Sequence, residues 1–276
     1  MKKLAIGLML ISMGQLLLAQ NQYKTEMKNS PNSTIDIQVG SDNVLIIGHD
    51  KNEIIITTDF KGEYIDEPTG QKKAVPDRAA GLKPLTADVA DNTGIGLVVE
   101  KNEDYFAVLK ISKNARNKTY TFYIPNKVHL SVNDVFAQAQ TTYSIENLTG
   151  ELEINALNSQ IKMKNVSGPV VANATNGNVE VVYSAITPNK PNSILSVNGY
   201  VDVSLPANVG ADLELHTVNG EIYTDMDVNV DKDASKGIPV MASNMNMFSL
   251  EGTINGGGTP FSIQSVNGDI YLRKKK

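Results

Sequence analysis

The sequence predicts an all-β protein built from short, repeated strands. Apolar and polar residues alternate along most of the chain, which is typical of half-buried strands. A turn unit of the form Ser/Thr-Val-Asn-Gly recurs between these strands. Past the N-terminal leader, no long stretch has the period near 3.6 that an amphipathic helix requires. These three observations exclude a helical or mixed fold class.

Residues 1–19 have the layout of a secretory signal peptide. Lys2 and Lys3 form a positive start, residues 4–18 are almost entirely apolar, and Ala19 is a small residue at a cleavage position. The apolar stretch is shorter than the roughly 20 residues that cross a bilayer comfortably. We therefore expect an exported protein with no transmembrane segment after signal cleavage. Its expected location is the periplasm, the outer-membrane surface or the extracellular space.

We expect residues 20–32 to form a flexible N-terminus and residues 33–273 to form a single all-β domain. A basic tail, 274–276, follows that domain. The segment at about 60–100 is rich in Pro and Gly and predicts a loop insertion. Aromatic residues make up only 6% of the chain, so the core should be aliphatic. The chain has no Cys, which excludes disulfides, and its net charge of -5 argues against nucleic acid as a partner.

The repeat unit contains an Asn-Gly turn after Val197, Val218 and Val266, and degenerate copies precede these three. The turn position recurs at 150, 159, 168 and 177, then at 199, 220 and 268. Because Asn-Gly tolerates positive φ, we expect Gly220→Val to destabilise the fold. The predicted structural turn positions are Gly150, Gly168, Gly177, Asn198, Gly199, Asn219, Gly220, Asn267 and Gly268.

The regular early spacing favours a β-solenoid, a single-stranded, β-helix-like stack of short strands and Asn-Gly turns. One unit is a short strand with its turn, and two units form a circuit of about twenty residues, a reasonable size for one coil. Asn-Gly between alternating runs is also a strong hairpin signal. An antiparallel β-sandwich or meander therefore remains the alternative, although neither requires constant spacing.

These residues resemble a known family. The Ser/Thr-Val-Asn-Gly-x-Ile/Val units, the segment 91–97 and the ending 255–273 are similar to secreted bacterial proteins classed as candidate adhesins, built on a domain of unknown function. The resemblance covers roughly residues 33–273. It implies an all-β, solenoid-like fold and an envelope or surface location, and it implies no catalytic residues.

We predict no catalytic, cofactor-binding or metal-binding residues, and no cofactor. His49, His129 and His216 have no second His or Cys at metal-ligand spacing, and no Gly-x-Ser-x-Gly segment is present. The acidic stretch 225–233 fails as an EF-hand, because its sixth position is Val230 rather than Gly. We expect this stretch to be a strand with a solvated acidic face.

The sequence therefore favours an exported, non-catalytic envelope or surface protein, an adhesin that binds an envelope protein or a glycan. Two other classes remain open. One is a carbohydrate-active enzyme on a β-helical scaffold, whose paired carboxylates would come from different coils. The other is an envelope structural protein without a specific ligand.

Overall fold

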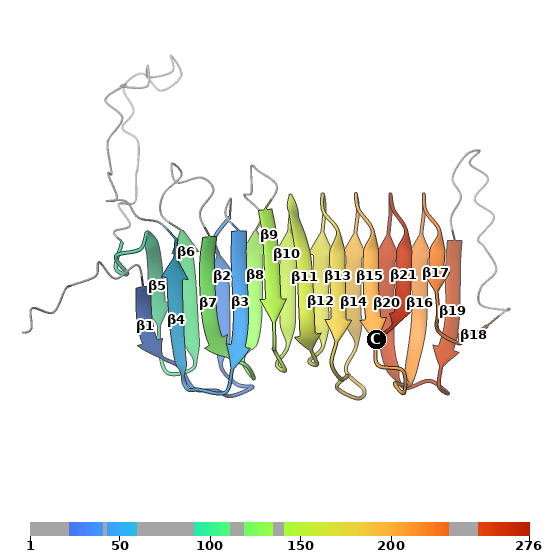
Figure 1. Ribbon diagram of the computed structural model, residues 1–276, viewed down its shortest axis with the longest axis horizontal. Helices are drawn as coiled ribbons and strands as arrows, with labels where there is room; N and C mark the ends of the chain where they lie inside the picture. Colours follow the sequence, from blue (N-terminus) through green and yellow to red (C-terminus); the bar gives the residue numbers. More distant parts are fainter. Residues whose placement is uncertain (1–21, 41–42, 60–90, 111–118, 135–140, 232–247) are drawn as a thin grey trace, which may run out of the picture.

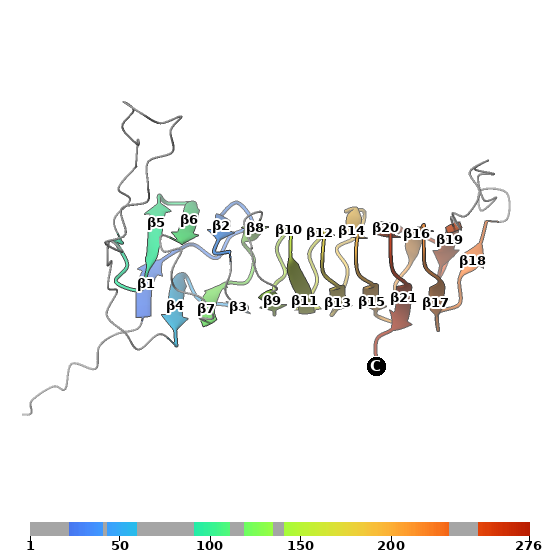
Figure 2. The same ribbon diagram turned by 90° about the horizontal axis from the view of Figure 1, so that it is seen from above.

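The computed structural model describes residues 22–40, 43–59, 91–110, 119–134, 141–231 and 248–276. Across these residues the chain forms strands and turns, so the all-β prediction is confirmed. The strands make two open sheets that lie face to face along an elongated molecule (Figures 1 and 2). Both sheets contain parallel and antiparallel pairs.

Sheet A has ten strands and sheet B has eleven. In spatial order, sheet A consists of β1 (Gln22–Glu26), β4 (Glu53–Thr58), β7 (Thr119–Pro125), β3 (Asn43–His49), β9 (Thr141–Glu146), β11 (Ser159–Val166), β13 (Val179–Tyr183), β15 (Val201–Leu205), β21 (Ile270–Lys274) and β17 (Ile222–Thr224). Sheet B consists of β18 (Asn229–Val230), β19 (Phe248–Ile254), β16 (Ala211–Thr217), β20 (Thr259–Ser265), β14 (Asn192–Ser196), β12 (Val170–Ala174), β10 (Leu152–Ala156), β8 (His129–Asp134), β2 (Thr34–Gln38), β6 (Tyr105–Lys110) and β5 (Leu97–Lys101).

From β8 to β17 the chain alternates strictly between sheet B and sheet A. We call one sheet-B strand and the following sheet-A strand a coil. Successive coils pair in parallel: Leu152 lies opposite Val170, and Val171 lies opposite Ser193. The nine-residue spacing of the sequence therefore carries the chain from one sheet to the other. The parallel pairing in this region differs from that of an antiparallel meander.

The order of coils in space departs from their order in the chain at both ends. The last coil, β20–β21, lies between the coils β14–β15 and β16–β17 and pairs in parallel with both. The first coil, β2–β3, likewise lies between β6–β7 and β8–β9. Antiparallel pairs then flank the stack: β1–β4 and β5–β6 near the N-terminus, and β16–β19 near the C-terminus.

The core is the layer between the two sheets. Alternate residues of each strand point into it, as the period-two pattern predicts, and most of them are Val, Ile, Leu or Ala. The expectation of a purely aliphatic core is wrong in one respect. The largest fully buried side chains are aromatic: Tyr120, Tyr143, Tyr183, Phe106, Phe122 and Phe261.

Parts of three expected segments lie among the described residues. The N-terminal segment 20–32 contains strand β1, which is held by antiparallel pairing with β4 and followed by the buried Met27. The basic tail begins inside β21, where the backbone N–H of Lys274 donates to Asp225. The loop insertion at 60–100 lies mostly outside the described residues, and its last part is the start of β5.

Candidate binding surface

The predicted turn positions come together as columns along the long axis of the molecule. Gly177, Gly199, Gly268 and Gly220 occupy equivalent places in four successive coils. A Cβ on Gly220 would overlap the carbonyl oxygen of Gly268, and the same overlap relates each glycine of this column to the one before it. Gly168 stacks on Gly150 in a second column, at the opposite ends of the strands.

The expected reason for these glycines is wrong. Among the described residues, positive φ occurs at other glycines and at four asparagines, and at none of the predicted turn glycines. Gly220 is required because the backbones of neighbouring coils approach too closely for a side chain, not because its φ is positive. Gly220→Val is still expected to destabilise the fold, through overlap with the neighbouring backbone.

The asparagines that precede these glycines form a ladder of side-chain hydrogen bonds. Asn176 Nδ2 donates to Asn158 Oδ1 at 2.7 Å, and Asn198 Nδ2 donates to Asn176 Oδ1 at 2.7 Å. Asn267 then donates to Asn198, and Asn219 donates to Asn267, both at 2.8 Å. Asn176, Asn198 and Asn267 each donate to the coil on one side and accept from the coil on the other, so the ladder fixes the register of these coils.

The histidines remain apart from one another in the described structure. His49 Nδ1 accepts from the backbone of Lys51 at 3.1 Å, and His129 Nδ1 lies 3.7 Å from Glu151. His216 is half-buried on β16. Within the described residues, no three His, Asp or Glu side chains gather closely enough to hold a metal ion.

The acidic stretch forms less strand than we expected. Only β18 is a strand there, because the preceding residues turn around the end of the stack. Met226 is buried as expected, but Val230 is exposed. Positions 232 and 233 lie outside the described residues.

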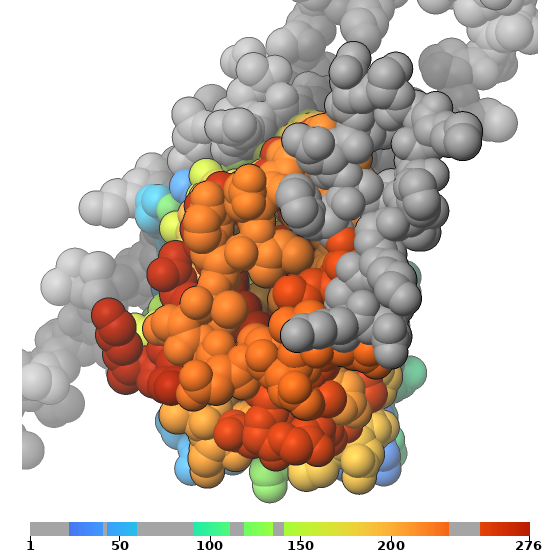
Figure 3. All heavy atoms as spheres, turned by 90° about the vertical axis from the view of Figure 1, so that its right-hand side faces the viewer, coloured from blue at the N-terminus to red at the C-terminus, as the bar shows by residue number. Residues whose placement is uncertain are grey.

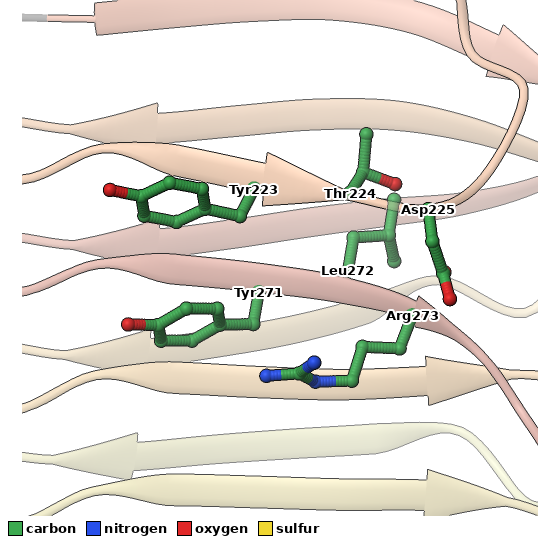
Figure 4. A pocket seen from close by; sticks show the side chains of 6 residues that line it. All are labelled: Tyr223, Thr224, Asp225, Tyr271, Leu272 and Arg273. Carbon is green, nitrogen blue, oxygen red and sulfur yellow. The ribbon is translucent and has the colours of Figure 1, made fainter.

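A row of tyrosines on the outer face of sheet A is the most distinctive surface feature of the described residues. Tyr271 lies on β21 and Tyr223 on β17, and Tyr200 directly precedes β15, the other neighbour of β21. They lie at the C-terminal end of the stacked coils, the end that Figure 3 views. The Tyr223 and Tyr271 rings are nearly parallel, with centroids 5.4 Å apart and planes 12° apart (Figure 4). Tyr200 meets Tyr271 edge to face at 6.0 Å. We call these three residues the tyrosine stack.

Charged groups hold this stack in place. The Arg273 guanidinium lies 5.1 Å from the centroid of the Tyr271 ring, a cation–π contact, while its Nε donates to both carboxylate oxygens of Asp202 at 3.0 and 2.9 Å. The Tyr271 hydroxyl donates to Asp269 at 2.9 Å. This hydrogen bond raises the pKa of the Tyr271 hydroxyl.

Tyr200 is fixed in the same way. Its hydroxyl donates to Glu180 at 2.6 Å. This hydrogen bond, together with burial, raises the pKa of Tyr200 to about 12, so the side chain is neutral at physiological pH. Tyr223, in contrast, is 51% exposed and lies on β17, the last strand of sheet A in the described residues.

A shallow pocket of about 230 Å³ opens beside the stack. Tyr223, Thr224, Asp225, Tyr271, Leu272 and Arg273 line it (Figure 4). Aromatic, hydroxyl, carboxylate and guanidinium groups are thus available in one small area. The geometry suits non-covalent recognition, because Tyr223, Tyr271 and Arg273 lie on strands. Asp225 follows β17, and its carboxylate is held by the backbone N–H of Lys274.

The tyrosine stack was not predicted from the sequence. One signal was present: Tyr223 and Tyr271 each occupy the third position after an Asn-Gly turn. That position faces outward, so two aromatic residues there indicate an exposed pair. Their contact could not be deduced, because 48 residues separate them and the last coil is placed out of chain order.

Comparisons with known proteins give limited similarity. No protein-family model matches the chain, and no curated protein matches it. A candidate cell adhesion protein from Clostridium sporogenes ATCC 15579 is 12% identical, with 92% of this chain and 99% of that chain covered at a TM-score of 0.46. A candidate adhesin from Bacteroides fragilis NCTC 9343 is 12% identical, with 92% and 96% covered at a TM-score of 0.38. Among the described residues, no helix is long and apolar enough to cross a membrane.

Proposed function

We propose that this chain is an exported, non-catalytic adhesin of the bacterial cell envelope, and that its stacked coils form a β-solenoid whose outer face binds a partner. The observation that carries the proposal is the tyrosine stack on the outer face of sheet A. Trp, Tyr and Arg are enriched at binding hot spots. Tyr in particular offers a large contact area and a polar group at low conformational-entropy cost.

The construction of the fold supports a binding role. Ladder hydrogen bonds and close-packed glycines tie each coil to its neighbours, so the outer face is a rigid platform. A rigid platform loses little entropy when it binds. Export is supported by Lys2, Lys3, the apolar stretch 4–18 and Ala19.

Binding of the chain 20–276 to whole bacterial cells tests this function. Fluorescently labelled protein should bind in a saturable manner, unlabelled protein should compete for the same sites, and heat-unfolded protein should not bind. The Tyr223→Ala/Tyr271→Ala variant should bind at least about tenfold more weakly, because hot-spot truncations cost about 2 kcal/mol or more.

Absence of saturable binding would contradict the adhesin proposal. New reducing ends appearing in the incubated envelope polysaccharide would instead favour a carbohydrate-active enzyme. Thermal unfolding of the double variant should be measured in parallel, because weaker binding is meaningful only if the variant remains folded.

A further inference from the structure

We propose that the tyrosine stack and the pocket beside it bind a neutral carbohydrate, with a sugar ring packed against Tyr223. This inference rests on the proposed binding function and specifies its ligand class. It begins from the position of Tyr223, whose ring packs on Tyr271 through one face. The opposite face points beyond the last described strand of sheet A, so a flat group can extend the stack there.

The ring carbons of a sugar present C–H groups on one face and hydroxyls around the edge. A tyrosine ring complements such a face, because it is apolar in its body and electron-rich above its plane. Arg273 on the far side of Tyr271 holds that ring in position, and Tyr271 in turn supports Tyr223. The stack is therefore arranged before any ligand arrives.

The polar lining of the pocket suits hydroxyl groups. Asp225 offers a carboxylate and Arg273 offers a guanidinium, and each planar group can engage two adjacent hydroxyls. Thr224 adds a hydroxyl that both donates and accepts. At about 230 Å³ the pocket is smaller than those that enclose drug-sized molecules, which favours one unit of a longer chain lying across the surface.

The charges of the site favour a neutral ligand over an acidic one. Arg273 is already paired with Asp202, and Asp225 accepts a hydrogen bond from the Lys274 backbone at 2.6 Å. The charge of Arg273 is thereby compensated, whereas the Asp225 carboxylate keeps its negative charge, which disfavours an anionic ligand. The chain as a whole has a net charge of -5, which repels polyanions at a distance.

A glycan array tests this proposal directly. The probes are neutral hexose oligosaccharides of microbial and host type, with sialylated and sulfated glycans on the same array for comparison. We expect the labelled chain 20–276 to bind at least one neutral group and to prefer it over the charged glycans. Tyr223→Ala should lower that signal about tenfold or more, whereas Tyr223→Phe should retain it, because the ring rather than the hydroxyl makes the contact.

Tyr123→Ala is the matched control. Tyr123 is an exposed tyrosine on β7 of the same sheet, outside the tyrosine stack. Its replacement should leave the array signal unchanged. All variants should unfold at a similar temperature, since the altered side chains are exposed.

Three results would overturn the carbohydrate proposal: no neutral glycan bound, a preference for charged glycans, or an equal signal from wild type and Tyr223→Ala. If whole cells still bind the wild-type chain while the array stays blank, the binding function stands. The partner recognised by the stack would then be a protein.

Discussion

Backbone contact between coils explains the glycine at each Val-Asn-Gly turn. Gly220 lies over the carbonyl of Gly268, and Gly268 lies over the carbonyl of Gly199, so no room remains for a Cβ. The sequence pattern located these positions correctly. It suggested the wrong reason, because turn glycines with positive φ and glycines in close packing look alike in a single sequence.

Two substitutions at Gly220 separate these reasons. Positive φ is tolerated by asparagine, as Asn147 and Asn165 illustrate in this chain. Close packing rejects every side chain. We therefore expect Gly220→Ala and Gly220→Asn both to lower the free energy of unfolding by about 1–3 kcal/mol, the usual cost of overpacking. Urea unfolding measures both, and an Asn variant clearly more stable than the Ala variant would restore the positive-φ explanation.

The loop before β5 is held together by its own hydrogen bonds. The carboxylate of Asp91 accepts from the backbone N–H groups of Thr93, Gly94 and Gly96 at 2.7–2.9 Å. The loop buries Ile95, whose carbonyl accepts from the Tyr120 hydroxyl. Burial alone would raise the pKa of Asp91, but these hydrogen bonds outweigh it and hold the pKa below its usual value.

A lowered pKa makes this loop sensitive to acid. Asp91 binds a proton more weakly in the folded chain than in the unfolded one, so its contribution is complete above the ordinary Asp pKa of about 4 and is lost as the pH falls below it. We expect Asp91→Asn to cost roughly 1 kcal/mol at pH 7, since one acceptor and the charge are lost. Urea unfolding at pH 7 and pH 3 measures this, and a cost that does not shrink at pH 3 would contradict the account.

The strand elements were largely predictable. The positions 150, 159, 168 and 177 predicted short strands, and the structure has strands of five to eight residues there, placed alternately in sheets B and A. The asparagine ladder was not predicted, although three of its members, Asn198, Asn219 and Asn267, were among the predicted turn positions. A ladder depends on which coils are neighbours, and local alternation carries no information about that.

At the scale of the whole molecule, both terminal coils lie one place inside the stack. The coil β20–β21 has a parallel neighbour on each side, and so does β2–β3. In a simple linear repeat the terminal units have one neighbour and open first. Here the last coil, β20–β21, also places Tyr271 between Tyr200 and Tyr223. The tyrosine stack therefore depends on the position of this coil.

Native-state hydrogen exchange, followed by mass spectrometry of peptides, tests this arrangement and the surface that depends on it. Amides of β20 and β21 should exchange as slowly as those of β12 and β13, because both sets are paired on two sides. Amides of β17 and β18, short strands at the edges of their sheets among the described residues, should exchange earlier. If β20 and β21 instead exchange together with β17 and β18, ahead of β12 and β13, the last coil is not held inside the stack and the tyrosine stack has no rigid base.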